Sequence, residues 1–397
     1  MSMTTRNPLQ DDYVAFPKAT RPQVPGQLEL WTQATADGVY DLNPVERGWV
    51  AIQPWLLTKG YALRPRYVPG WKPRWIGTDI YPGAFEDSVS IYLPNIIDAT
   101  QLSSGRTVAI KWVPHAENTR SELEIMRFLS SPELKDSDDP RNHCNPVLDT
   151  FTHPDNPNGI FIVTPWLAGF VFVPIDSVCE VVDMLSQLLE GLIFMHEHNV
   201  AHRDCTGMNI MQDVRTLFPG LRTHPQRPCY SENIQIRYDH IPRSRASVKY
   251  YFIDFGISAR FEGPGPHLVT GTACRDRTAP ELSATVPYDP FKLDVYLLGN
   301  HFLKAFLAKF ENLEFLRPLL VEMTQKNPSD RPTAQQAYDK LKAIAREPFG
   351  LPFRWRIRPR EAEGVEYLIE EVGSAIREIS AQARTLLFGG SELSFGR

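Results

Sequence analysis

The sequence predicts a fold of the α+β class, and three observations support this prediction. Residues 106–113 (RTVAIKWV) have the length and the apolar, β-branched content of a buried strand. Residues 175–198 have the apolar spacing of a helix, with these side chains on one face: Val178, Val182, Leu185, Leu189, Leu192 and Ile193. The chain has 397 residues, so we expect one large two-lobed domain with extensions, or two domains.

Three regions follow one another along the chain. Residues 1–80 are rich in proline and tryptophan, and because disordered tails are poor in aromatic residues, we expect their second half to pack on the rest of the protein. Residues 81–348 alternate strand-like runs with helical periods. Residues 349–397 form a C-terminal extension with the spacing of a docked amphipathic helix, carried by Val365, Leu368, Ile369, Val372, Ile376 and Ile379.

The overall composition limits the class of function. A net charge of -5 and a pI near 6.1 argue against nucleic acid as a partner, because binding a phosphate backbone needs a concentrated basic face. The five cysteines are odd in number and include no CxxC pair, which is typical of reduced thiols in the cytoplasm or nucleus. The first residues contain no apolar run of the kind that directs secretion.

One uncharged stretch, residues 156–175, has about the length of a membrane-spanning helix. Pro165, Gly169 and Pro174 interrupt it. We therefore expect two buried strand or hinge segments here and no membrane partner.

The segment VAHRDCTGMNIMQD (200–213) contains candidates for chemistry. Asp204 is followed five residues later by Asn209, and the later strand YYFIDFGIS ends at Asp254, before a flexible glycine. A carboxylate that orients an acceptor hydroxyl and oxygen ligands that hold a divalent cation are what phosphoryl transfer requires. The alternative is that Asp204 and Asp254 are ordinary turn residues.

Charged residues elsewhere fit the same chemistry. Lys111 lies in the middle of the strand 106–113, where it needs an anionic partner, although a strand lysine can also extend to solvent. The following helix offers Glu122 or Glu124. We favour Glu122, because Ile125, Met126 and Leu129 then face a core.

Three residues further along are predicted to hold the site together. Glu281 in TAPEL and Arg331 in NPSDRPT indicate a buried ion pair that joins a loop to a later helix. Asp294, at the start of an apolar helix, can anchor the segment around Asp204 through backbone N–H groups. His196, His198 and His202 could suggest a metal, but their spacing favours packing and capping.

These elements occur in one order, and over residues 90–348 the chain resembles the eukaryotic protein kinase family, in a divergent form similar to fungal kinase-like proteins. The matching motifs are VAIK, HRD with its later Asn, DFG, APE, DVYLLG and RPT. The resemblance implies a two-lobed protein kinase-like fold, with a small β-rich N-lobe at about 81–165, a larger helical C-lobe at about 170–348 and an insertion at about 213–248.

The resemblance also implies roles in ATP and metal binding. Asp204 is the catalytic carboxylate, Asn209 and Asp254 hold Mg or Mn, and Lys111 contacts the phosphates of ATP and pairs with Glu122. These assignments follow from the motifs and not from the spacing alone.

Adenine binding and regulation are implied in the same way. Thr164 and Trp166 lie in the hinge that contacts adenine. Arg203 reads the phosphorylation state of the segment 254–281, for which we choose Thr270 over Ser258, Thr272 and Thr278. The alternative for Arg203 is that it binds the backbone of a segment ordered by packing.

The chain also departs from the family pattern. Val89, Ile91 and Pro94 occupy the positions expected for the three glycines of the phosphate-binding loop, and glycine there lets backbone N–H groups approach phosphate. Thr206 stands where serine/threonine kinases usually place a lysine. The gap between Asp204 and Asp254 is long enough to contain an inserted loop.

Three functions stay open. The first is a protein kinase that transfers the γ-phosphoryl group of ATP to a protein substrate, with serine or threonine as the preferred acceptor. The second is a pseudokinase that binds nucleotide or a partner as a scaffold. The third is a small-molecule phosphotransferase, which the TAPEL and NPSDRPT segments disfavour. We favour the kinase, because no charged participant has been lost.

Overall fold

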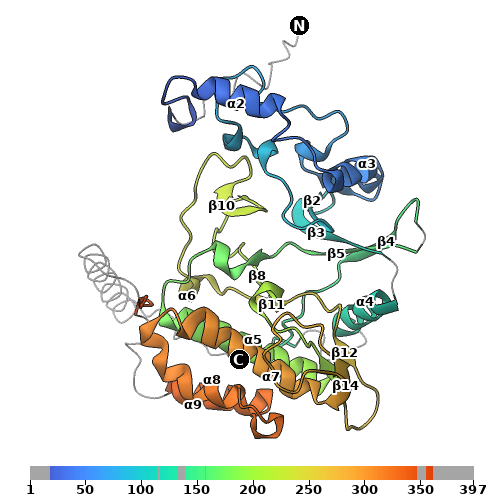
Figure 1. Cartoon of the computed structure of the whole chain (residues 1–397), viewed down its shortest axis with the longest axis vertical. Helices are drawn as coiled ribbons and strands as arrows, with labels where there is room; N and C mark the ends of the chain where they lie inside the picture. Colours follow the sequence, from blue (N-terminus) through green and yellow to red (C-terminus); the bar gives the residue numbers. More distant parts are fainter. Residues whose placement is uncertain (1–17, 115–116, 132–138, 157, 347–354, 361–397) are drawn as a thin grey trace. The chain divides into compact units, whose positions relative to one another are not determined.

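The computed structural model describes residues 18–114, 117–131, 139–156, 158–346 and 355–360 (Figure 1), which divide into two compact units. The sheet unit contains the described residues of Met1–Thr119 together with Pro146–Val173 and Asp213–Ile241. The helical unit contains those of Arg120–Asn145, Pro174–Gln212 and Pro242–Arg397. The chain is thus a mixture of helices and strands that includes a curled sheet, in agreement with the α+β class.

The sheet unit is built on five antiparallel strands in the order β1-β2-β3-β5-β4. Their bounds are β1 Tyr61–Leu63, β2 Ile96–Gln101, β3 Arg106–Val113, β4 Asp149–Thr152 and β5 Ile160–Pro165. The predicted strand 106–113 is confirmed as β3, whose Val108 and Ile110 are buried on one face. The uncharged stretch 156–175 contains β5, β6 (Ala168–Gly169) and the short helix η5 (Phe170–Phe172), as strand and hinge segments.

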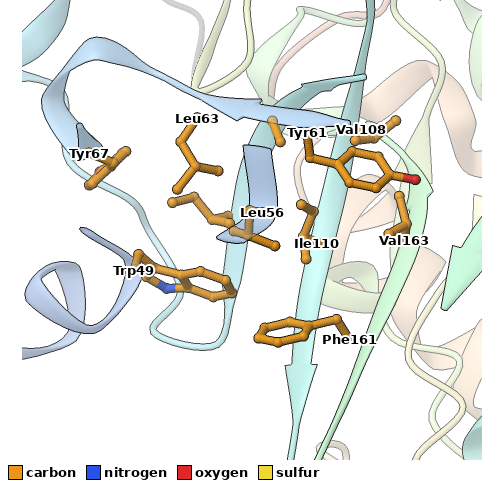
Figure 2. Close-up of a cluster of buried hydrophobic side chains, with 11 residues drawn as sticks. Trp49, Leu56, Tyr61, Leu63, Tyr67, Val108, Ile110, Phe161 and Val163 are labelled. Atoms are coloured by element: carbon orange, nitrogen blue, oxygen red, sulfur yellow. The ribbon is translucent and has the colours of Figure 1, made fainter. Parts of the chain in front are cut away.

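Helix α3 (Pro44–Thr58) covers one face of this sheet. It begins with a capping box, in which the Asn43 side chain accepts from the Glu46 backbone N–H and the Glu46 carboxylate accepts from the Asn43 backbone N–H. Its Trp49 and Leu56 point toward strand side chains such as Phe161 and Ile110 (Figure 2). The buried cluster consists of Trp49, Leu56, Tyr61, Leu63, Tyr67, Ile97, Ala99, Val108, Ile110, Phe161 and Val163.

The proline- and tryptophan-rich segment is therefore part of the sheet unit. Strand β1 pairs with β2, with Leu63 opposite Ala99, so a boundary at about residue 80 would separate the first strand from its sheet. Trp75, Ile80 and Phe85 form a second buried cluster. The expectation that the second half of this segment packs on the protein is confirmed. Its other elements are η1 Lys18–Thr20, α2 Gln27–Ala36 and η2 Pro65–Tyr67, and η3 Pro82–Ala84 and η4 Glu86–Ser88 follow it.

Residues 64–95, which connect β1 to β2, are tied to the sheet by buried ions. The Arg64 guanidinium lies 2.7 Å from an Asp98 carboxylate oxygen on β2 and 2.9 Å from one of Glu86. The positions expected for phosphate-loop glycines, Val89, Ile91 and Pro94, lie in this connection and outside any strand or helix.

The expected insertion divides between the two units. Its first part, 213–241, belongs to the sheet unit and contains β9 (Thr223–His224) and β10 (Arg227–Ser231). The His224 Nε2 atom lies 3.4 Å from a Glu86 carboxylate oxygen. Burial acts to raise the pKa of Glu86, but hydrogen bonds from His224 and Arg64 outweigh it and hold this pKa below its usual value.

The helical unit is centred on α5 (Val178–Glu197), which confirms the helix predicted from apolar spacing. Helix α9 and strand β11 pack against α5, and the apolar side chains of α5 are buried on most of its sides. The helices of this unit are α4 Glu117–Leu129 (in the main part), α6 Arg243–Ala246, α7 Pro290–Phe302, α8 Arg317–Met323 and α9 Ala334–Arg346 (Figure 1), with shorter turns at η6 Gly207–Asn209, η7 Leu303–Leu307, η8 Glu311–Leu316 and η9 Pro328–Asp330.

Short pairs of strands flank the loops of the helical unit. Strand β7 (Val200–Ala201) pairs with β12 (Ala259–Arg260), β8 (Ile210–Gln212) with β11 (Tyr250–Phe252), and β13 (Val269–Gly271) with β14 (Ser283–Tyr288). These pairs fix both ends of the loop around Asp204 and the start of the loop after Asp254.

Two expectations concern the ends of the chain and the membrane. The amphipathic helix expected from Val365 to Ile379 lies outside the described residues. None of the helices in the described ranges combines the length and the apolar character that crossing a membrane requires.

We predict that α3 stabilises the sheet unit through its buried face. Leu56 is 0% exposed and Leu57 is 45% exposed on the same helix. Leu56→Ala should lower the free energy of unfolding by about 2 to 5 kcal/mol, because it removes buried methyl groups and leaves a cavity. Leu57→Ala, the matched control, should change it by less than about 0.5 kcal/mol. Urea denaturation followed by tryptophan fluorescence measures both, and equal effects would contradict this packing.

Candidate functional site

A buried carboxylate in α7 organises the loop that contains Asp204. Asp294 is 0% exposed and accepts hydrogen bonds from the backbone N–H groups of His202, at 2.9 Å, and Arg203, at 2.6 Å. The His196 ring nitrogen lies 2.9 Å from the same carboxylate, and the Cys205 thiol lies 3.6 Å from it. The prediction that Asp294 anchors this loop through its backbone is confirmed.

Arg203 is held in a left-handed backbone conformation, with φ of 68°. For a residue other than glycine, this backbone conformation costs about 1 to 3 kcal/mol, so hydrogen bonds from the surrounding structure must maintain it. The bond from its N–H group to Asp294 is one of them. The next residue, Asp204, contacts Asn209 and Arg275.

The Arg203 guanidinium contacts the segment 254–281 through main-chain oxygens. It donates to the carbonyl of Ile257 at 3.0 Å and to the carbonyl of Thr270 at 2.8 Å. This geometry matches the alternative in which Arg203 binds the backbone of the segment. The Thr270 side chain is exposed. Phosphorylation of Thr270 stays a prediction, which mass spectrometry of active protein would check.

Asp204 is 6% exposed, and both of its carboxylate oxygens have partners. Oδ2 accepts from the Asn209 amide nitrogen at 2.8 Å and lies 3.5 Å from the Arg275 guanidinium. Oδ1 accepts from the Arg275 backbone N–H at 2.9 Å. The structure thus brings Asp204 and Asn209 together, as the sequence predicted, and adds Arg275, which the sequence analysis did not identify.

Asp254 follows β11 and lies in the same region. Its φ of 64° is left-handed, a conformation that Asp tolerates better than most residues. A hollow in the helical unit is lined by Asp204, Asp254, Gly256, Ile257, Ala273 and Arg275. Two of the predicted site residues therefore face one open space.

Glu122 on α4 approaches this hollow. Carboxylate oxygens of Asp254 and Glu122 lie 3.4 Å and 3.8 Å from where a Cβ on Gly256 would stand. Glu122 is buried and Glu124 is exposed, while Ile125, Met126 and Leu129 are buried, as predicted. Any side chain at position 256 would contact both carboxylates, so the glycine keeps that space open.

The oxygen atoms of the site fit a divalent cation. Mg usually takes one or two carboxylates from the protein and keeps several waters. Asp254 lines the hollow with a carboxylate, and Asn209, whose amide nitrogen donates to Asp204, carries an amide oxygen of the kind that such a cation accepts. In the described ranges, no three His, Cys, Asp or Glu residues gather as a metal-binding group.

The predicted ion pair between Glu281 and Arg331 is confirmed. Two guanidinium nitrogens lie 2.5 Å and 2.8 Å from the Glu281 carboxylate oxygens, and both side chains are buried. Arg331 also donates to the carbonyls of Gln325 and Lys292. This bidentate pair fixes the end of the segment 254–281 to the helices that follow.

The three histidines near Asp204 pack and cap, as expected. His196 contacts Asp294, His198 lies 2.7 Å from the carbonyl oxygen of Phe194, and His202 lies 3.0 Å from that of Ile253. Each ring thus holds a helix end or a loop in place.

The remaining predicted site residues belong to the sheet unit. Lys111 lies on β3 opposite Ile96 and Ile162 of the neighbouring strands. Thr164 is buried at the end of β5, and the Trp166 indole donates to the carbonyl of Pro225 at 3.2 Å. Their assignments to ATP stay predictions.

Arg275 is the functional candidate that sequence reasoning missed. Its contact with Asp204 joins residues 71 positions apart. Arg275 lies in the short stretch between Thr272 and the APE motif. No motif assigned a role to it.

Comparison with known proteins adds no assignment: no protein-family model matches this chain, and no curated protein sequence matches it. The function must be argued from the residues of the site and their geometry.

We predict that the Asp294 carboxylate stabilises the helical unit more than the N-cap carboxylate of the same helix, Asp289. Asp294→Asn should lower the free energy of unfolding by about 2 kcal/mol or more, since an amide N–H would face backbone donors in a buried place. The matched control is Asp289→Asn at the N-cap of α7, where Asp accepts from two backbone N–H groups and Asn caps equally well. Similar losses in thermal and urea denaturation would show that Asp294 does not anchor the loop.

Proposed function

We propose that this protein is an ATP-dependent protein kinase, with a preference for serine or threonine. The observation that supports the proposal best is the hollow that Asp204 and Asp254 line, with Asn209 bonded to Asp204 and with the loop anchored by Asp294. We also propose that the sheet unit and the helical unit correspond to the small and large lobes of a two-lobed protein kinase-like fold.

Asp204 would orient the acceptor hydroxyl and receive its proton. The hydroxyl oxygen forms a bond to the γ-phosphorus as the bond from that phosphorus to the bridging oxygen of ADP breaks, and the proton passes to the Asp204 carboxylate. A carboxylate offers about four acceptor positions. Hydrogen bonds from the Asn209 amide and the Arg275 backbone N–H take two of them, so acceptor positions remain for the hydroxyl.

Asn209 and Asp254 would hold Mg or Mn, which when bound neutralises charge on the phosphates of ATP. Asn209 would then have two functions, because its amide nitrogen donates to Asp204 and its amide oxygen would be a ligand of the cation. The roles of Lys111 for the phosphates and of Thr164 and Trp166 for adenine concern the sheet unit and stay predictions from the resemblance.

A protein acceptor is favoured over a small molecule. The buried pair Glu281–Arg331 and the pairing of β13 with β14 hold the chain around 269–288 as an ordered segment beside the hollow-lining residues Ala273 and Arg275. In the family that the sequence resembles, this segment presents peptide. These contacts support the preference for a protein hydroxyl.

A pseudokinase that binds nucleotide or a partner is the second candidate. The connection 64–95, clamped by Arg64, Glu86 and Asp98, stands where a flexible glycine loop is expected, which favours weaker phosphate binding. Turnover separates the two candidates, because a scaffold needs binding and a kinase needs transfer.

We predict ATP-dependent transfer that requires Asp204. Asp204→Asn should lower kcat by about 10² to 10⁴, because it removes the proton acceptor and leaves the size of the side chain unchanged. ATP turnover with Mg or Mn, on a mixture of protein substrates, measures this effect. Asp330→Asn, on the exposed surface, is the control and should keep wild-type activity. Wild-type protein without turnover but with metal-dependent nucleotide binding would favour the pseudokinase.

We also predict that ATP stabilises the protein more in the presence of Mg than in its absence, because a ligand that binds the native state raises apparent stability. Asp254→Asn should remove the metal-dependent part. Asn is preferred to Ala here, because it tolerates the left-handed backbone of this position. Thermal denaturation with ATP, with and without Mg, gives the result, and identical shifts would remove Asn209 and Asp254 from the metal site.

A further inference from the structure

The lining of the hollow contains two carboxylates and one cation. Asp204 and Asp254 are the carboxylates, and Arg275 is the cation among the described lining residues. A phosphoryl group carries negative charge, so this lining repels it unless cations compensate for the carboxylates. A bound metal ion is one source of positive charge, and Arg275 is the source among the residues that line the hollow.

The residues that follow Asp204 in its loop provide no such cation, and the Arg203 guanidinium before it donates to main-chain carbonyls of Ile257 and Thr270. The four residues between Asp204 and Asn209 are Cys205, Thr206, Gly207 and Met208, all uncharged. The Thr206 hydroxyl is buried and forms no hydrogen bond within the described part of the chain. Positive charge must therefore reach Asp204 from another segment.

Arg275 is positioned for this purpose by its own neighbours. Its backbone N–H donates to Asp204 at 2.9 Å, which fixes the Cα of Arg275 beside the carboxylate. The preceding residue, Cys274, is buried and its thiol lies 3.2 Å from the Asp276 carbonyl. The Arg275 main chain is thus held on both sides.

The nearby Asp276 carboxylate has partners other than the Arg275 guanidinium. The Asp276 carboxylate accepts from Asn300 and Thr278, both at 2.6 Å, and lies 3.2 Å from Lys304. Its charge is already compensated. Within the described residues, Asp204 is the ion-pair partner of Arg275.

The guanidinium keeps capacity for a ligand. Its side chain is 55% exposed, and the nitrogen that contacts Asp204 is Nε, at 3.5 Å. A guanidinium has five N–H donors in a planar fork, and this fork matches the oxygens of a phosphoryl group. The donors on the two terminal nitrogens are therefore available beside Asp204.

We propose that Arg275 is a catalytic residue, whose guanidinium binds the phosphoryl group during its transfer and stabilises the charge that develops there. This inference rests on the proposed kinase function and names a participant in the same site. Arg275, from a distant segment of the same chain, would supply the positive charge that Thr206 in the loop around Asp204 lacks.

The test compares Arg275→Ala and Arg275→Lys with Arg277→Ala in the full-length protein. Arg277 is exposed, lies two residues further along the same segment and does not line the hollow. Arg275→Ala should lower kcat by about 10² to 10³, the effect of removing one donor to developing charge, with a smaller change in KM for ATP. Arg275→Lys should recover part of the loss, and Arg277→Ala should match the wild type.

Two further measurements separate chemistry from folding. Millimolar guanidinium chloride should restore part of the activity of Arg275→Ala, which a purely structural role would not allow. The mixture of ADP, Mg and aluminium fluoride, a mimic of the transferring phosphoryl group, should raise the melting temperature of the wild type above the value with ADP and Mg. Arg275→Ala should lose this increment.

The outcomes distinguish the inference from the function on which it rests. Wild-type turnover together with an Arg275→Ala variant that keeps its full kcat would overturn the role of Arg275 and leave the kinase proposal standing. Wild-type protein without turnover and without a metal-dependent nucleotide shift would overturn the kinase proposal, and the role of Arg275 with it.

Discussion

The buried carboxylate of Asp294 is the constraint on which the candidate site depends. Four groups from α5 and the loop after β7 converge on it, and two of them are consecutive backbone N–H groups. Burial raises the pKa of Cys205 well above its usual value, so the fourth group is a neutral thiol that adds no negative charge. Because a buried anion without partners is costly, this carboxylate allows one conformation of the loop. The left-handed turn at Arg203, whose N–H donates to this carboxylate, is part of that conformation.

The charges around Asp204 are mainly negative. Asp204 and Asp254 line the hollow, Asp254 and Glu122 lie beside Gly256, and Arg275 contacts Asp204. Arg203 points instead to main-chain oxygens of the segment 254–281. Of these two arginines, Arg275 is the one that lines the hollow, while Arg203 holds the main chain of the segment.

The sheet unit shows a different use of buried charge. Arg64 at the end of β1, with Asp98 on β2 and Glu86 between them, joins the long connection to the sheet, and His224 and Gln226 attach the inserted strands to the same carboxylates. Such a network stabilises one arrangement, because an opening that leaves a buried ion unpaired raises the free energy. The connection 64–95 is thus built for a fixed position, unlike a glycine loop.

The sequence by itself determined the features that depend on local pattern or on complementary charge. Periodicity alone predicted β3 and α5, and the burial of Ile125, Met126 and Leu129 together with Glu122, because side-chain period reports which face is buried. The ion pair Glu281–Arg331 and the anchoring role of Asp294 were predictable because buried charges need partners.

Tertiary structure alone decided the place of β1 in the sheet and of 213–241 in the sheet unit, because three-residue strands and loops carry too few residues for a period. It also decided the contact between Arg275 and Asp204, which joins residues far apart in the chain by packing that no local pattern records.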